Sequence, residues 1–152
     1  MSFSVTVNIS DSMERAMDIR RSQVAVLQGM KVAGLAMKKT IKAGIKGGPK
    51  TGRIYNFKGR KHRSSAPGEY PANRSGALLK SIDFKVENAI KLEVGSQDIK
   101  YAPILQQFKT PTQRASNWRK IAPRPFLTLA HDENAPFFPM IMANVIQKEL
   151  GI

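Results

Sequence analysis

Residues 12–46 read SMERAMDIRRSQVAVLQGMKVAGLAMKKTIKAGIK, and this stretch decides the fold. Its apolar side chains recur at broadly helical spacing: Met13, Met17, Val24, Leu27, Met30, Met37, Ile41 and Ile45. Asp11 followed by Glu14 has the spacing of a capping box, which predicts that a helix begins here. Gly47-Gly48-Pro49 predicts where it ends. At about 1.5 Å per residue, a helix from Ser12 to Lys46 would be roughly 50 Å long.

Three glycines interrupt this predicted helix, at Gly29, Gly34 and Gly44. Each weakens a helix by about 1 kcal/mol relative to alanine. We therefore expect the helix to bend, or to fray near its end. Methionine is a flexible filler of cores and contact surfaces, so the methionines favour packing over a cofactor site.

Short strands are predicted on both sides of this helix. Ser4–Ile9 alternates apolar and polar residues, which is typical of a strand. Arg53–Phe57 has the composition of one arm of a hairpin. Asp83–Val86 and Ile90–Val94 flank Asn88-Ala89, and this arrangement predicts a second hairpin.

Further helices are predicted in the second half of the chain. Ser75 is a good N-cap for a short helix that continues to Ile82. Tyr101–Phe108 is expected to form another short helix. Asn134–Leu150 is expected to form the last one, with Pro136 tolerated in its first turn.

Polar loops connect these segments. Residues 47–75 and 109–122 are expected to be long and exposed, and long loops in compact domains are often functional. Residues 123–125 should be extended, because residues before proline avoid the helical region. The sequence thus predicts one α+β domain over residues 1–152. A long N-terminal helix and a C-terminal helix pack on a small antiparallel sheet.

Charge is the strongest feature of the composition. The 152 residues carry a formal net charge of +14 and no cysteine, which excludes disulfides and cysteine-based metal sites. No acidic residue lies between Asp18 and Glu69, whereas that interval is rich in lysine and arginine. Such a block indicates either a polyanionic or acidic partner, or simply a solvated basic face.

The sequence has no apolar run near the roughly 20 residues that a membrane-spanning helix needs. Residues 1–10 lack the basic and apolar segments of a signal peptide. We therefore expect a product of the cytoplasm.

Two segments resemble catalytic motifs and are better explained as structure. Residues 44–51 read GIKGGPKT, close to a phosphate-binding loop, but Pro49 removes an N–H that should contact phosphate. His131-Asp132-Glu133 points in different directions on a helix, and the acids suit the start of the last helix. His62 has no acid nearby in the sequence. We predict no enzyme activity, no cofactor and no metal.

Three segments carry a recognisable pattern. They are Ser65-Ala66-Pro67-Gly68-Glu69-Tyr70-Pro71-Ala72-Asn73-Arg74-Ser75-Gly76-Ala77-Leu78-Leu79-Lys80-Ser81-Ile82, Tyr101-Ala102-Pro103-Ile104-Leu105-Gln106-Gln107-Phe108 and Ala122-Pro123-Arg124-Pro125-Phe126-Leu127. In this order, after a basic helix, they resemble the tail-completion and neck family of long-tailed phages, which includes proteins similar to minor tail protein Z.

The resemblance implies a structural protein of the virion. Such a subunit would complete the tail and join it to the head, as one member of a ring, with a hexamer matching the symmetry of a phage tail. Its expected partners are further copies of itself and the adjacent neck, tail-terminator or tail-tube proteins. DNA passing through the ring is a possible non-specific partner. The expected location is the virion, after assembly in the host cytoplasm.

A closed ring needs two different complementary surfaces on each subunit. We expect one from the basic residues between Lys31 and Arg63 and the other from acids of the C-terminal half, namely Asp83, Glu87, Glu93, Asp98, Asp132 and Glu133. Arg124, held extended between two prolines, is expected to point outward toward a carboxylate of a neighbour, and a pair with an acid of the same chain such as Glu93 is the alternative. The candidate interface residues are Lys38, Lys39, Lys42, Arg53, Tyr55, Phe57, Arg60, Arg63, Glu69, Arg74, Tyr101, Phe108, Trp118 and Arg124.

A basic nucleic-acid-binding module is the alternative function. The basic block favours it, together with Tyr55 and Phe57, whose rings could stack on bases. No helix-turn-helix, zinc-finger or RNA-recognition signature accompanies them. The sequence leaves both functions open.

Overall fold

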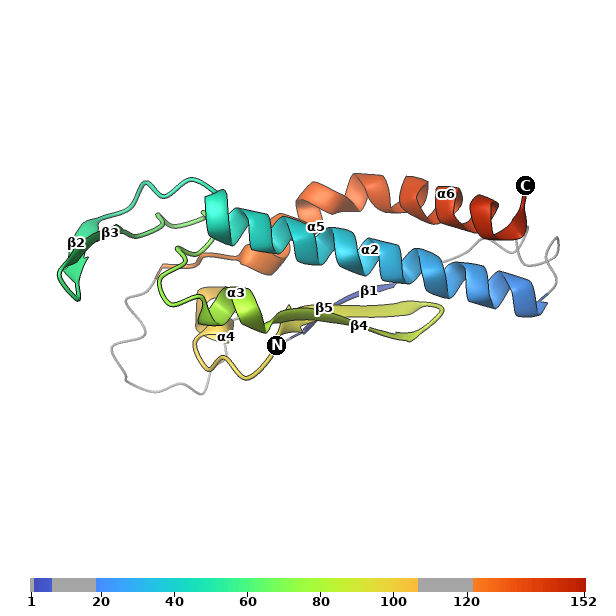
Figure 1. Cartoon of the computed structure of the whole chain (residues 1–152), viewed down its shortest axis with the longest axis horizontal. Coiled ribbons are helices and arrows are strands. Elements are labelled where there is room, and N and C mark those ends of the chain that lie inside the picture. Colours follow the sequence, from blue (N-terminus) through green and yellow to red (C-terminus); the bar gives the residue numbers. More distant parts are fainter. Residues whose placement is uncertain (1, 7–18, 107–121) are drawn as a thin grey trace.

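The computed structural model describes residues 2–6, 19–106 and 122–152 (Figure 1). The predicted α+β architecture is confirmed: a long N-terminal helix and a C-terminal helix accompany a small antiparallel sheet. In chain order the elements are β1 (Ser2–Thr6), α2 (Ile19–Gly47), β2 (Ile54–Phe57), β3 (Arg60–Arg63), α3 (Ala77–Ser81), β4 (Ile82–Asn88), β5 (Lys91–Ser96), α4 (Ala102–Gln106), α5 (Phe126–Asn134), the 3₁₀ helix η2 (Ala135–Phe137) and α6 (Phe138–Leu150).

The main sheet has three antiparallel strands in the order β1-β5-β4. β4 and β5 form the predicted hairpin, with Phe84 opposite Val94 and an irregularity between Val86 and Asn88. Along β5 the side chains of Leu92 and Val94 are buried, and those between them are partly exposed. This alternation places one face of the sheet against the core and leaves the other to solvent.

Helix α2 lies between this sheet and α6 (Figure 1). Met30, Met37, Ile41 and Ile45 are fully buried on it, as their spacing predicts. The prediction was wrong for Val24, whose side chain is 55% exposed, because the neighbouring Ala25 and Val26 occupy the buried face. The predicted start of the helix, with Met13 and Met17, lies outside the described residues.

The glycines of α2 allow close packing. A Cβ atom on Gly34 would clash with the ring of Phe84 on β4, so glycine is what lets this helix approach the sheet. The helix is unbroken from Ile19 to Gly47. The expected fraying is therefore not seen, because burial against the sheet and α6 outweighs the weak helical propensity of glycine.

The C-terminal region differs from the single helix predicted for Asn134–Leu150. A separate helix, α5, begins directly after Pro125, and Pro136 lies in the 3₁₀ turn between α5 and α6. Residues 131–133 thus lie in the last turns of α5. The prediction that they begin the last helix was wrong, because the turn around Pro136 starts a new helix four residues later than the acids suggest.

The β2–β3 hairpin projects beyond the C-terminal end of α2 (Figure 1). β2 was predicted, whereas β3 was assigned to a loop. The two strands are joined by Lys58 and Gly59, both with positive φ (50° and 75°), which is the geometry of a tight two-residue hairpin turn. None of the helices in the described part of the chain is long and apolar enough to cross a membrane.

Candidate functional site

The three segments that carry the family resemblance meet at one end of the fold. The N–H of Gly68 donates to the carbonyl of Pro123 over 2.9 Å, and the N–H of Arg124 donates to the carbonyl of Leu105 over 2.7 Å. Segments that are far apart in the sequence therefore form one continuous surface, which we call the loop junction: residues 64–76, 101–106 and 122–128.

Arg124 lies at the centre of the loop junction and points inward. Its guanidinium donates to the carbonyl and hydroxyl oxygens of Ser65 and to the carbonyl of Ala122. The prediction that Arg124 presents its guanidinium outward was wrong. Ser65 is almost completely buried, and among the described residues the Arg124 side chain is the donor to its carbonyl.

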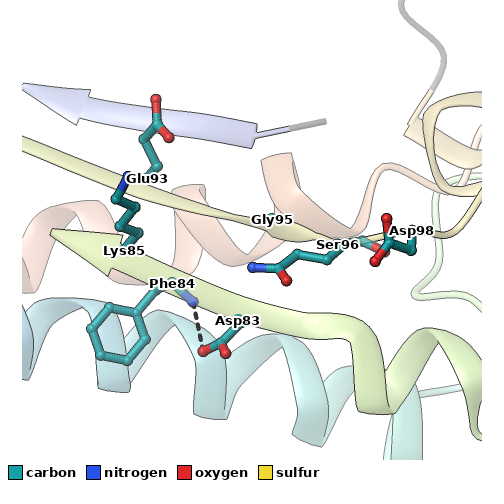
Figure 2. Close-up of a pocket in the computed structure, with 8 residues that line it drawn as sticks. Asp83, Phe84, Lys85, Glu93, Gly95, Ser96 and Asp98 are labelled. Carbon is teal, nitrogen blue, oxygen red and sulfur yellow. Dashed lines mark hydrogen bonds between the residues drawn. The ribbon is translucent and has the colours of Figure 1, made fainter. Parts of the chain in front are cut away.

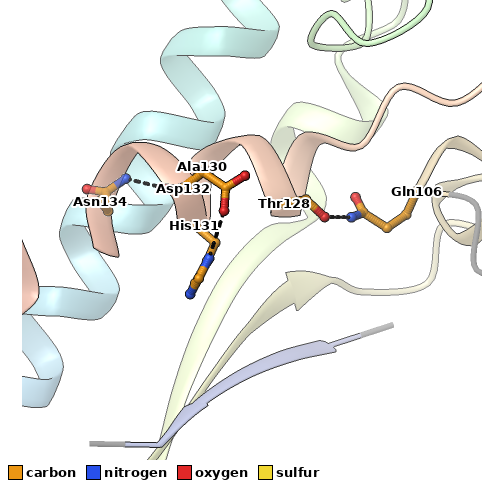
Figure 3. A network of polar contacts seen from close by, with 6 residues as sticks. All are labelled: Gln106, Thr128, Ala130, His131, Asp132 and Asn134. Carbon is orange, nitrogen blue, oxygen red and sulfur yellow. Dashed lines mark hydrogen bonds and ion pairs between the residues drawn. The ribbon is translucent and has the colours of Figure 1, made fainter. Parts of the chain in front are cut away.

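Gln106 connects α4 to α5 (Figure 3). Its buried side chain accepts a hydrogen bond from the N–H of Leu127 and donates to the hydroxyl of Thr128 over 2.6 Å. The first N–H groups of a helix have no partner within the helix, and Pro125 cannot cap them with its side chain. Gln106 therefore acts as a distant N-cap for α5.

Glu69 fastens the loop that follows the β2–β3 hairpin. Its carboxylate accepts hydrogen bonds from the N–H and hydroxyl of Thr51 and from the N–H of Ala66, the last over 2.7 Å. These donors, led by the Thr51 hydroxyl, hold the pKa of the Glu69 carboxyl below its usual value. A residue expected at an interface thus has a role within the chain.

Tyr70 is buried beside the end of α2. Its hydroxyl donates to the carboxylate of Glu133 on α5 over 3.0 Å, and burial is the main reason that its pKa is raised. The ring lies against Gly44, where a Cβ atom would come within 2.5 Å of it. The ring therefore needs a glycine at this position of α2.

Lys50 belongs to the same cluster. Its ammonium group donates to the carbonyls of Gly44 and Tyr70, and partial burial lowers its pKa. The carbonyl of Gly44, in the last turn of α2, also accepts a hydrogen bond from the N–H of Gly48. Lys50 is a second donor to it. The lysine of the segment that resembles a phosphate-binding loop therefore caps the C-terminus of α2 with its side chain.

A pocket of about 470 Å³ opens on the loop junction, with Tyr55, Arg74, Tyr101, Leu105 and Arg124 among its lining residues. It connects the predicted interface residues Tyr55, Arg74, Tyr101 and Arg124, which are dispersed in the sequence. Most of its surface is apolar, and two arginines border it. The structure thus groups part of the predicted interface set in one place.

Four of the remaining predicted residues, Arg53, Phe57, Arg60 and Arg63, lie on or beside the β2–β3 hairpin. Tyr55 and His62 stack with ring centroids 6.1 Å apart, and the guanidinium of Arg74 lies 4.1 Å from the ring centroid of Phe57. Arg53, Arg60 and Arg63 are exposed. Arg74 therefore connects the aromatic side of the hairpin to the loop junction.

The predicted interface lysines of α2 lie outside both the hairpin and the loop junction. Lys38 pairs with Asp83 of β4 over 2.9 Å, Lys39 is exposed, and Lys42 is half-buried. Lys38 is therefore occupied within the chain. Of the other predicted interface residues, Phe108 and Trp118 lie outside the described residues.

The outer face of β4 and β5 carries a second pocket of about 480 Å³, with Asp83, Lys85, Glu93 and Asp98 in its lining (Figure 2). Lys85 and Glu93 are opposite each other across the two strands. Lys91 forms ion pairs with Glu87 and Glu93, over 2.8 and 3.0 Å. Of the six acids expected to form a complementary surface, Asp83, Glu87 and Glu93 therefore pair with lysines of the same chain.

Near the predicted catalytic-looking triplet, His131 contacts Asp132 over 3.1 Å, and Asn134 bonds back to the carbonyl of Ala130 (Figure 3). Within the described ranges, no cluster of three or more His, Cys, Asp or Glu residues has a geometry that could hold a metal ion.

Residues that sequence reasoning missed are mainly those that hold the loops: Gly44, Ser65, Tyr70 and Gln106. Only Tyr70 gave a signal, as a lone aromatic residue inside a Pro- and Gly-rich segment. Comparison of the chain with protein families, curated proteins and solved structures found no match.

Proposed function

We propose that this protein is a structural subunit of the neck of a tailed phage, which completes the tail and joins it to the head as part of a ring. The observation that supports this most is the loop junction. The three segments whose sequence resembles the tail-completion family are joined there by Gly68–Pro123, Arg124–Ser65 and Arg124–Leu105 hydrogen bonds. A chance resemblance in unrelated loops gives no reason for the three to meet.

The loop junction is suited to docking. Pro67 and Pro71 restrict its backbone, while Glu69 and Arg124 fix it by hydrogen bonds. A loop that is already ordered loses little entropy when it binds a neighbour, so more of the contact energy appears as affinity. Its polar groups are used to hold the loop in shape, and we infer that the protein acts by joining surfaces and carries out no reaction.

A ring requires contacts between different surfaces of adjacent subunits. In this proposal the pocket at the loop junction is one such surface, and the outer face of β4 and β5, which carries Glu87 and Glu93, is the other. The proposed partners are further copies, in a hexamer, and the adjacent neck, tail-terminator or tail-tube proteins. The proposed location is the head–tail junction of the virion.

Deleting the gene from the phage that encodes it tests this function. We expect filled heads and complete tails that fail to join, and a large loss of infectious particles. Adding purified protein to the separated parts should restore joining without nucleotide or metal. Normal particles from the deletion, or joining that requires nucleotide hydrolysis, would contradict the proposal.

Ring formation has a separate test. Analytical ultracentrifugation and electron microscopy of the purified protein, alone and with tails, should show a closed ring on the tail end. A protein that stays monomeric in the presence of tails would contradict the ring.

A further inference from the structure

The β2–β3 hairpin concentrates positive charge that the rest of the chain does not neutralise. Five basic residues lie between positions 53 and 63, with no acid among them: Arg53, Lys58, Arg60, Lys61 and Arg63. None of the five forms an ion pair with an acid in the described part of the chain. Holding these like charges close together is unfavourable, so a polyanionic partner would be bound strongly.

The charges lie on both faces of the hairpin and at its turn. In an antiparallel pair, residues opposite each other share a face. Arg60 is opposite Phe57 on the aromatic face, and Arg63 is opposite Ile54 on the other face with Lys61. Lys58 is in the turn. A flat acidic surface would contact only one face, whereas the walls of a groove would contact both.

The described residues of a second copy offer little negative charge to the hairpin. Glu69, Asp83, Glu87, Glu93, Asp132 and Glu133 all have hydrogen-bond or ion-pair partners within the chain. Of the acids that the structure describes, Asp98 and Glu149 have no such partner, and they are single charges in separate places, one between β5 and α4 and the other on α6. The described residues of a second copy therefore present no cluster of free acids to match the hairpin, whereas a nucleic acid carries a regular row of phosphates.

We propose that the β2–β3 hairpin binds double-stranded DNA by inserting into the major groove and contacting phosphates on both sides. The major groove is about 12 Å wide and admits a two-stranded β ribbon. Four paired residues per strand, at about 3.3 Å each, give a ribbon roughly 13 Å long. This is enough to reach the floor of a groove about 8.5 Å deep. The contacts are mainly ionic and independent of base sequence.

Two contacts tie the hairpin to the rest of the chain. Arg74 lies over the ring of Phe57, beside the turn, and at the base of the strands the N–H of Ser64 donates to the carbonyl of Arg53 over 3.0 Å. These contacts hold the hairpin pointing away from the body (Figure 1). The DNA site is independent of the proposed neck function, since it requires only the hairpin and its charges.

Binding of the purified full-length protein to a fluorescent DNA duplex, measured over a range of salt concentrations, tests this. The hairpin variant R60Q/K61Q/R63Q removes three charges. Loss of three phosphate contacts should make the slope of log K against log salt shallower by about 2 to 3 and weaken binding at least roughly tenfold at low salt. The single variant K61Q should change the slope by about 0.9 or less.

Two controls separate the hairpin from net charge. K80Q/K100Q/K148Q removes the same charge from exposed lysines outside the hairpin and should bind nearly as the native protein does. R60K/R63K keeps the hairpin charge and should retain the slope. Circular dichroism checks that each variant is folded, and K61Q serves if the triple variant is not.

Three results would overturn the DNA site. Equal losses in the hairpin and control variants would show that only net charge matters. Competition by polyglutamate as strong as by DNA, at equal charge, would indicate an acidic protein partner instead. No binding of the native protein at low salt would exclude the site outright. Because this assay uses purified protein and DNA, its failure leaves the head–tail joining test unaffected.

Discussion

The guanidinium of Arg124 holds Ser65 by both its backbone and its side chain. Nε donates to the Ser65 hydroxyl over 2.7 Å and Nη2 donates to the Ser65 carbonyl over 2.8 Å, although the two residues are 59 positions apart. Ser65 is only 2% exposed, so these groups have no access to water as an alternative partner. Arg124 thus holds the start of the loop that follows the hairpin, and Glu69 holds its next turn.

Replacing Arg124 should therefore destabilise the fold. Arg124→Ala leaves a buried carbonyl without a donor, and we expect it to lower the free energy of unfolding by about 2 kcal/mol in denaturant titrations. Arg124→Lys should recover only part of this, because an ammonium group lacks the planar set of N–H groups that reaches Ser65 and Ala122 together. Arg53→Ala, on an exposed arginine, should change stability by less than about 0.5 kcal/mol. Full stability of Arg124→Ala combined with lost assembly would favour the outward role that the sequence suggested.

Gly44 should be required by Tyr70. Alanine normally stabilises a helix by about 1 kcal/mol relative to glycine. At Gly44, however, its Cβ atom would lie 2.5 Å from the ring of Tyr70, which is buried and tied to Glu133. Since overpacking costs about 1–3 kcal/mol, we expect Gly44→Ala to lower stability on balance.

Gly47→Ala is the matched control, because nothing lies within 4 Å of a Cβ atom at that position. It should leave the midpoint of thermal unfolding unchanged or slightly raised. If Gly44→Ala were as stable as Gly47→Ala, the close contact between α2 and Tyr70 would have no energetic weight.

Local patterns in the sequence predicted much of the fold. The stripe of Met30, Met37 and Ile41 depends only on helical period, and the β4–β5 hairpin depends on alternation around a turn. Both features were found because neighbouring residues carry the information. The end of α2 was also found, since Gly47-Gly48-Pro49 cannot continue a helix.

Local patterns could not predict the loop junction, because its hydrogen bonds join residues that are far apart in the sequence. Arg124 between two prolines predicts an extended backbone, but only the fold brings Ser65 close enough to turn the side chain inward. Gln106 has no local signal for capping a helix that begins twenty residues later. The acids of the second half were expected to be available, but Asp83 pairs with Lys38, which is 45 positions away and which no local pattern indicates. Glu87 and Glu93 pair with Lys91, which is close to both in the sequence.

Acid should weaken the link between Glu69 and its donors. The pKa of the Glu69 carboxyl is lowered from 4.5 by hydrogen bonds from Thr51 and Ala66, so folding favours the charged form. Its contribution to stability is then fully present above pH 4.5 and is lost as the pH falls through the lowered pKa. The stability difference between the native protein and Glu69→Gln should thus shrink in urea titrations at progressively lower pH.

Asp83 and Glu87 also have lowered pKa values, and their effect is common to the native protein and the variant, so it cancels in that difference. Glu149→Gln, at an exposed position near the end of α6, is the charge-matched control. A difference for Glu69→Gln that stays constant down to low pH would mean that the carboxylate is not held by these donors.

Hydrogen exchange should divide the segment between α2 and α3 into two parts. The sequence predicts that all of residues 47–75 are mobile in the free subunit, because few apolar residues hold them. The structure restricts that expectation to the β2–β3 hairpin, since Ser65 and Tyr70 are buried and the N–H of Gly68 bonds to Pro123. An isolated two-stranded hairpin is only marginally stable, so its amides should exchange quickly. The amides of Gly68 and Arg124 should exchange slowly in the same sample.

On assembled particles, or with DNA bound, the hairpin amides should become protected while those of the loop change little. Strong and equal protection of the hairpin in the free and bound states would show that it needs no partner to be ordered.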